Sequence, residues 1–267
     1  LITFKNNMYS LQDTALAILY VNPTSIITDQ NNLPLQLGTG STLEKHFYHS
    51  IDIGTKHQWS VSKSAENITF VDIRHNKIYL FNGETLNPIS DTKGNRGFLN
   101  KVLHDYIRVN DNPILGKGIL TTYDYKDNEF LYTFLNQAAV NSGEETELVD
   151  EKYTLAYSDL MDSFTSFYSF TPYIYINNRT YLYTPKDYSL TGVRSKLYMH
   201  DKGNYCTFYD VVYPSSIKVN INDNPSKTKV YDNISWVSES IKDNRVYIDD
   251  LNDVLQESDN INQLDDT

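Results

Sequence analysis

Two histidines lie at a spacing that could bind a metal ion. His46 and His49 form a His-x-x-His pattern, and imidazole nitrogens are common ligands of zinc and other transition metals. The pattern lacks the glutamate and the four-residue spacing of a His-Glu-x-x-His zinc helix. Cys206 is the single cysteine, which rules out a cysteine-based zinc site and an internal disulfide. We therefore expect no metal and no cofactor.

Motifs for other chemistry are equally weak. The sequence has no Gly-x-Ser-x-Gly nucleophile elbow, and Gly38-Thr39-Gly40 has too few glycines for a dinucleotide or phosphate loop. The sequence leaves open a pair of carboxylates for glycoside hydrolysis, because two such residues can lie far apart in the sequence and still be close in the fold. Cys206 lies in a strand-like pattern, which indicates a buried, inert thiol. We expect a protein that is not an enzyme.

The charge of the chain is negative and uneven. The net charge is −11, and the segment 243–267, with eight acidic residues and one arginine, contributes −7 of it. Ordinary DNA or RNA binding needs clustered lysines and arginines, so this balance argues against it. It is compatible with a surface that DNA passes without adhering, because like charges repel. A merely soluble acidic protein explains the composition equally well.

Two groups of acidic residues are candidates for lining a channel or contacting another subunit. One lies in the segment 136–152, whose small and acidic residues predict an exposed loop, and the other lies near the C-terminal end. The candidates are Glu144, Glu145, Glu147, Asp249, Asp250 and Asp253. The alternative interpretation is a solvated loop and a solvated tail.

The elements that would position such residues are organised around an aromatic stretch. Eight of the 20 residues 164–183 are aromatic, against 13% in the whole chain. After a strand at Phe164–Phe170, Tyr173–Ile176 and Thr180–Tyr183 predict a hairpin with its turn at Asn177–Arg179. We interpret the rings as the core of a β-meander, and a ligand-stacking surface is the alternative.

Strand–turn–strand units repeat along much of the chain, and their spacing of about 35 to 50 residues is typical of β-propeller blades. We therefore expect a mainly β fold of antiparallel hairpins and meanders, arranged like a propeller, with an additional β-rich region and one or two short helices. Besides a strand at Thr24–Thr28, the predicted pairs are Ile68–Ile73 with Ile78–Phe81, Thr121–Tyr125 with Phe130–Phe134, Tyr153–Tyr157 with Phe164–Phe170, Leu197–His200 with Tyr205–Tyr209, and Ser216–Ile221 with Lys229–Val237.

Two segments show helix signals. Ser10–Asp13 resembles a helix start, and the helix would end before Asn22-Pro23. Apolar residues at helical spacing predict a second helix over Gly97–Arg108. The longest apolar run, Ala15–Val21, is far shorter than the roughly 20 residues that cross a bilayer. We therefore expect no membrane insertion.

Composition divides the chain into four segments. We predict an N-terminal linker or packing segment with a short helix (1–57), a propeller-like meander region (58–212), a C-terminal hairpin region (213–242) and an acidic tail (243–267). The chain opens with Leu1-Ile2-Thr3-Phe4, without an initiator methionine or a basic leader. We therefore expect a processed or excised piece of a longer polypeptide.

Several strings of residues resemble a known protein family. They are Leu37–Gly40, Tyr48–His57, Phe70–Asp72, Ile78–Gly83, Phe164–Phe170, Tyr213–Ile217, Asn224-Pro225 and Thr228–Ile234. Through them the chain resembles the tail muzzle or stabilization proteins of crAss-like bacteriophages, which are similar to the β-propeller nozzle proteins of short-tailed phages. It departs from them by starting and stopping inside what should be a longer protein.

The resemblance implies a virion structural protein of the phage tail, assembled in the cytoplasm of the bacterial host. It implies a ring of six copies that caps the distal tail channel, retains packaged DNA and opens for ejection. The implied partners are further copies of the chain, other tail proteins, other pieces of the same polypeptide, and genomic DNA in non-specific passage. The alternative is a propeller-type module that binds or cleaves glycans, which exposed aromatics converging beside two carboxylates would favour.

Overall fold

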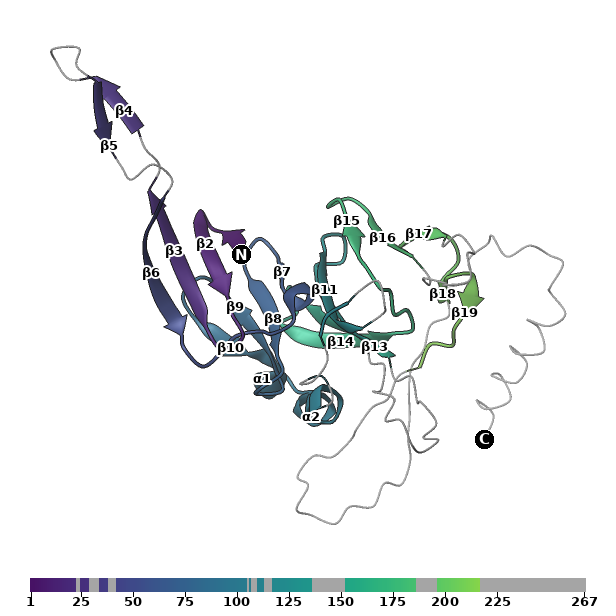
Figure 1. Cartoon of the computed structure of the whole chain (residues 1–267). Coiled ribbons are helices and arrows are strands. Elements are labelled where there is room, and N and C mark those ends of the chain that lie inside the picture. The colour runs from purple at the N-terminus through teal and green to yellow at the C-terminus, as the bar shows by residue number, and fades with distance from the viewer. Residues whose placement is uncertain are drawn as a thin grey trace, which may run out of the picture. The chain divides into compact units, whose positions relative to one another are not determined.

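Antiparallel sheets make up most of the protein that the computed structural model describes, together with two short α-helices (Figure 1). The described residues are 1–22, 25–28, 34–37, 42–104, 106, 110–112, 117–135, 152–185 and 196–216. Leu1–Ser215 form one unit and Ser216–Thr267 a second, and all the strands described below belong to the first. The prediction of a mainly β fold of antiparallel meanders is confirmed. The hairpin predicted between Ser216–Ile221 and Lys229–Val237 lies outside the described residues, apart from Ser216.

The first sheet is a four-stranded antiparallel meander in the order β1-β2-β3-β6. Its strands are β1 (Ile2–Phe4), β2 (Asn7–Leu11), β3 (Leu16–Asn22) and β6 (Thr42–Ser50). A hairpin of β4 (Ser25–Thr28) and β5 (Pro34–Leu37) is inserted in the chain between β3 and β6. The strand predicted at Thr24–Thr28 is confirmed by β4.

The helix predicted after Ser10 is wrong, because β2 and β3 occupy this segment. Ser10 pairs with Ala17 across the hairpin, so it does not cap a helix. The apolar run in β3 is continuous and contains the β-branched residues Ile18 and Val21, and such a run fits a buried strand as well as a helix. Pairing with β2 on one side and β6 on the other selects the strand.

The second sheet is another four-stranded antiparallel meander, in the order β10-β9-β8-β7. A 3-10 turn, η1 (Gln58–Ser60), precedes its strands β7 (Ser62–Lys63), β8 (Ile68–Asp72), β9 (Lys77–Phe81) and β10 (Leu86–Pro88), and the helices α1 (Ile89–Thr92) and α2 (Arg96–Leu103) follow. Helix α2 confirms the helix predicted at 97–108 over residues 97–103, and it buries the apolar side chains of Leu99, Val102 and Leu103. Residues 105, 107 and 108 of the prediction lie outside the described residues.

The third sheet repeats the meander and is followed by smaller units. It contains β11 (Gly118–Asp124), β12 (Glu129–Leu135), β13 (Lys152–Ser158) and β14 (Ser163–Tyr168), in that order. A three-stranded sheet of β15 (Ile176–Asn177), β16 (Leu182–Pro185) and β17 (Leu197–Met199) comes next, and then the hairpin of β18 (Thr207–Phe208) and β19 (Val211–Val212). The predicted pairs in the second and third sheets are confirmed. The hairpin predicted around Asn177–Arg179 is also confirmed, although Asn177 belongs to β15 and the turn begins after it.

The pairing predicted between Leu197–His200 and Tyr205–Tyr209 is wrong. Strand β17 pairs with β16, and β18 pairs with β19. Tyr209 and Asp210, between β18 and β19, both have a positive φ, as the two central residues of a type I′ turn do. This tight turn gives β18 a partner two residues further along the chain, which leaves β17 to extend the preceding sheet.

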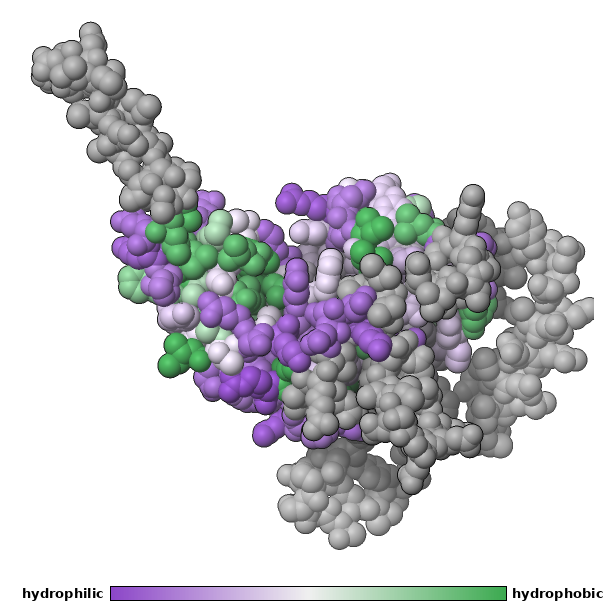
Figure 2. All heavy atoms as spheres, viewed as in Figure 1, coloured by the Kyte–Doolittle hydropathy of each residue, from purple (hydrophilic) through white to green (hydrophobic). Residues whose placement is uncertain are grey.

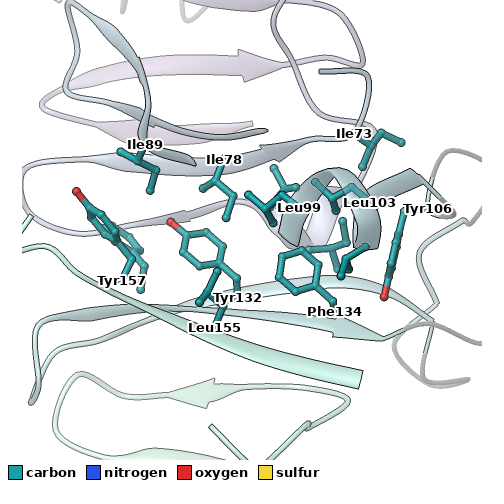
Figure 3. Packing of buried hydrophobic residues seen from close by; sticks show 14 of the residues in the cluster. Ile73, Ile78, Ile89, Leu99, Leu103, Tyr106, Tyr132, Phe134, Leu155 and Tyr157 are labelled. Atoms are coloured by element: carbon teal, nitrogen blue, oxygen red, sulfur yellow. The ribbon is translucent and has the colours of Figure 1, made fainter. Parts of the chain in front are cut away.

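Neighbouring sheets are joined by separate apolar cores. Tyr9 and Leu16 of the first sheet pack with Ile68 and Phe81 of the second. The largest core lies between the second sheet, α2 and the third sheet, and Figure 3 shows side chains from these elements pointing toward one another. Its members include Ile78, Leu99, Tyr132, Phe134 and Leu155. The third core joins Leu131 and Ala156 to Phe170, Leu182 and Tyr209.

The strands β11, β12 and β13 of the third sheet are buried on both faces. Along β12, Phe130, Tyr132 and Phe134 belong to the core shared with the second sheet, whereas Leu131 belongs to the core on the other side. This is the alternation that a strand imposes on successive side chains. Successive four-stranded meanders that stack through their faces are the arrangement of propeller blades. Closure of the blades into a ring stays a prediction.

Hydrophobic residues also gather at the surface near the first sheet. In Figure 2 they lie over the region where Figure 1 places β2, β3 and β6. Large apolar side chains with 38–54% exposure there are Tyr20, Val21, Leu43, Phe47 and Tyr48. A patch of apolar side chains that is exposed to solvent is often a binding surface for another protein.

Candidate functional site

The acidic residues predicted to face a channel are not among those that the structure describes. Glu144, Glu145 and Glu147 fall in the undescribed segment 136–151, and Asp249, Asp250 and Asp253 fall beyond residue 216. Their role therefore stays a prediction. The functional geometry below comes from other residues.

The histidine pair His46 and His49 does not form one ligand set. Both residues lie in β6, and positions three apart on a strand point to opposite faces of the sheet. The ring of His46 packs against Tyr48 with centroids 5.4 Å apart, and the ring of His49 packs against Phe81 at 4.9 Å. Burial lowers the pKa of His49. The two imidazoles serve packing on separate faces.

The prediction of a buried thiol at Cys206 is wrong. The cysteine is exposed, and its φ of 54° lies in the left-handed region. It precedes β18 instead of lying in a strand, and its carbonyl accepts the backbone N–H of Tyr213 at 2.8 Å. A chain reversal therefore occupies the position where the alternating sequence pattern predicted a strand.

One buried histidine–aspartate pair resembles part of a catalytic dyad. His57 is fully buried, and its Nδ1 is hydrogen-bonded to a carboxylate oxygen of Asp111. That carboxylate also accepts the backbone N–H groups of Trp59 and Ile119, each at 3.3 Å. The hydroxyl of Ser60 donates to the carbonyl of His57, not to its ring. Within the described residues, the pair thus ties chain segments together and activates no nucleophile.

A cavity of about 630 Å³ opens on the surface of the described residues. It is lined by residues from the segments 124–131, 168–170 and 198–210, and by Leu182. Its walls are therefore the β11–β12 turn, the end of β14 and the chain from β17 to β19. We call this cavity the Tyr205 cleft, after the tyrosine in it whose exposed fraction is 87%.

Carboxyl groups converge on one side of the Tyr205 cleft. Atoms of Asp124, Asp127 and Asp201 that could bind a ligand all lie within 4.8 Å of one another. The ammonium group of Lys126 lies 3.2 Å from a carboxylate oxygen of Asp201. Burial, together with the charges of Asp201 and Asp124, raises the pKa of Asp127. This side of the cleft is rich in hydrogen-bond acceptors.

Aromatic rings also line the Tyr205 cleft, and two of them are held in place by hydrogen bonds. The hydroxyl of Tyr168 donates to Glu129 at 3.1 Å, and that of Tyr198 donates to Asp210 at 2.7 Å. Burial and the Glu129 carboxylate raise the pKa of Tyr168. Because the hydroxyl groups of Tyr168 and Tyr198 are already hydrogen-bonded within the protein, these side chains present mainly the surface of their rings to a ligand.

Acid should destabilise the protein through His200. Burial lowers its pKa below the ordinary value of 6.5, and its Nε2 lies 2.7 Å from the hydroxyl of Thr184. Below about pH 6.5 the His200 imidazole is protonated in the unfolded chain, whereas its lowered pKa keeps it neutral in the folded chain. The stability that the protein has at higher pH is therefore lost as pH falls from 6.5 through the folded pKa of His200. Urea unfolding between about pH 7.5 and 5.5 should show a smaller loss in His200→Gln than in wild type. An unchanged loss in this variant, beside His46→Gln as the control, would contradict the role of His200.

Three stacked antiparallel meanders with aromatic cores define the class as a β-sheet scaffold protein. The chain belongs to the crassvirus muzzle protein family: a family model described as Crassvirus muzzle protein matches residues 1–188, and one described as Crassvirus muzzle protein C-terminal domain matches residues 203–266. The resemblance seen in the sequence strings is thereby confirmed. Membership of this family supports a virion structural role.

A curated relative agrees with the family models. The chain is 26% identical, over 252 residues or 92% of its length, to the muzzle protein of Bacteroides phage crAss001. It spans 16% of the length of that relative. In the described residues, no helix is both long and apolar enough to span a membrane.

Proposed function

We propose that the chain is part of a ring at the distal end of a phage tail, where it borders the channel, retains packaged DNA and opens for ejection. The family match over residues 1–188 and 203–266 carries the proposal. Assembly would take place in the cytoplasm of the bacterial host, and the finished protein would reside in the virion tail. The proposal requires no catalytic step and no cofactor.

The packing of the sheets supports a mechanical role. Each interface between neighbouring sheets is filled by buried aromatic and aliphatic side chains, and interiors packed this closely have low compressibility. Ring contacts such as Tyr9 with Phe81 and Phe98 with Tyr153, at 5.3 and 5.2 Å between centroids, add orientation to the packing. Such a body suits a channel wall that must keep its shape against packed DNA.

The proposed partners are further copies of the chain, other tail proteins and other pieces of the same polypeptide. A ring needs two different complementary surfaces on each copy, and we propose six copies, as the family resemblance implies. The exposed rings of Tyr20 in β3 and Phe47 in β6, with centroids 5.8 Å apart, give the chain an apolar surface suited to such contacts.

Acidic residues would keep DNA from adhering to the channel. Replacing Glu144, Glu145 and Glu147 with glutamine should slow DNA release at low salt, because the wall would then repel the phosphates less. The effect should vanish near 1 M salt, where the screening length falls to about 3 Å. Release from purified virions can be followed with a DNA-binding dye, and Asp249, Asp250 and Asp253 form a second set for substitution by asparagine.

The exposed acids Asp13 and Glu84 serve as the control for this experiment. Their neutralisation changes the net charge without touching the proposed channel residues. Release kinetics that stay at the wild-type value in both acidic sets would contradict the lubricating wall. Equal slowing in the control would show that net charge alone is responsible.

A further inference from the structure

The Tyr205 cleft has the size of a small-molecule site. Its volume of about 630 Å³ lies in the usual range of about 300–1,000 Å³ for ligand pockets. The cleft is built from three chain segments that the sheets bring together, and its floor includes the buried side chains of Leu131, Phe170 and Leu182. Because these side chains belong to a packed core, the floor of the cleft keeps its shape whether or not a ligand is bound.

The acids in the cleft are mostly engaged within the protein. Asp210 accepts the ammonium group of Lys196 at 3.0 Å, Asp201 pairs with Lys126, and Glu129 accepts two hydroxyl groups. Asp124 accepts the backbone N–H of Lys126 through one oxygen. Among the described residues, no donor reaches the Asp127 side chain. Asp124 and Asp127 are therefore left to accept hydrogen bonds from a ligand.

These pairings argue against a bare cation as the ligand. Calcium takes about six to eight oxygen ligands, whereas three carboxyl groups converge here and that of Asp201 is held by Lys126. Lys126 and Lys196 also pair with two of the carboxylates that would attract a basic peptide, those of Asp201 and Asp210. The remaining chemistry is that of a neutral ligand with several hydroxyl donors.

The aromatic rings that line the cleft favour a ligand with an apolar face. Tyr205 has an exposed fraction of 87%, and the hydroxyl groups of Tyr168 and Tyr198 are fixed by their hydrogen bonds. The rings of Phe170 and Phe208 also line the cleft, with centroids 5.1 Å apart. Because the side chain of Tyr205 is exposed to solvent, its ring offers a flat surface on which a ligand can stack. A sugar ring has such a face and carries hydroxyl donors around its edge.

We propose that the Tyr205 cleft binds a short oligosaccharide. A sugar ring stacks on Tyr205, and its hydroxyl groups donate to the carboxylates of Asp124 and Asp127, as charge-assisted hydrogen bonds. The site lies in the scaffold whether or not the chain forms a ring, so it is independent of the proposed channel role. It gives a phage structural protein a means of holding a surface glycan.

Binding to a broad array of neutral bacterial and animal oligosaccharides tests this proposal. The labelled 267-residue chain should bind at least one of them, and titration calorimetry with that oligosaccharide should give the same affinity at about 0.05 and 0.5 M salt, because a neutral ligand is not screened. Tyr205→Ala should weaken binding about fivefold or more, since a stacked aromatic contributes about 1 kcal/mol. Asp127→Asn should also weaken it.

Two matched variants keep the experiment decisive. Tyr181 is also exposed but lies outside the cleft, so Tyr181→Ala should bind as wild type does, and Asp13→Asn serves in the same way for Asp127→Asn. Circular dichroism of all four variants should match wild type, because none of these side chains is buried. Absence of binding across the array, or binding that Tyr205→Ala leaves unchanged, would overturn the proposal. So would binding restricted to octa-arginine and lost in salt, or to calcium alone.

Discussion

Phe134→Ala is expected to lower the free energy of unfolding by about 3–5 kcal/mol, the usual loss for removing a buried phenylalanine. Phe134 is fully buried in the core between the second and third sheets. Its ring lies edge-on to those of Phe98 and Tyr106, with centroids 6.4 and 6.3 Å away. The substitution removes these contacts and leaves a cavity that packed sheets cannot easily fill.

Phe167→Ala is the matched control, because the same change of side chain is made in the same sheet. Phe167 lies in β14 and is 54% exposed. Its truncation should cost less than about 1 kcal/mol, although its ring contacts Phe98. Urea unfolding of both variants gives the comparison. Equal losses would contradict a core centred between these sheets.

Gly54→Ala is expected to destabilise the protein by about 3 kcal/mol, at the upper end of overpacking effects. A Cβ at this position would lie 2.1 Å from the carbonyl oxygen of Gln12 and 2.6 Å from the backbone nitrogen of Ala15. Both are backbone atoms of the β2–β3 turn, so no side chain can rotate away. The backbone N–H of Thr55 also donates to Gln12 at 2.8 Å, and this bond would be strained.

Gly97→Ala is the control for the glycine substitution. Gly97 lies in α2, and a Cβ there meets no atom within 4 Å. Alanine favours a helix over glycine by about 1 kcal/mol, so this variant should be as stable as wild type or more so. Thermal unfolding of the two alanine variants gives opposite shifts. A loss in Gly97→Ala, or none in Gly54→Ala, would contradict the packing described at these positions.

Local sequence patterns predicted the elements whose signals agree with one another. The helix at 97–108 has regular apolar spacing, and α2 forms there. The polar turns Arg74–Lys77 and Lys126–Glu129 each contain an asparagine, and Asn76 and Asn128 adopt the positive φ that tight turns need. In these places the nearest neighbours in the chain decide the structure.

Distant pairing decided the elements that were mispredicted. The run in β3 is compatible with a helix until β2 and β6 bind its two edges. The Tyr205 cleft was missed because its walls lie far apart in the sequence, at 124–131, 168–170 and 198–210. The aromatic stretch 164–183 and the acidic residues of the β11–β12 turn can be recognised in the sequence, but only the stacking of the sheets brings them together.

The position of the chain in the virion tests the proposed tail role most directly. Antibodies against the described region 58–104, bound to intact particles of a phage that encodes the chain and viewed by electron microscopy, should label the distal end of the tail. Particles that have ejected their DNA should carry the label at the same place, because the ring opens without leaving the tail. Label on the capsid, or chain found in the lysate but absent from purified virions, would contradict the role in the tail channel.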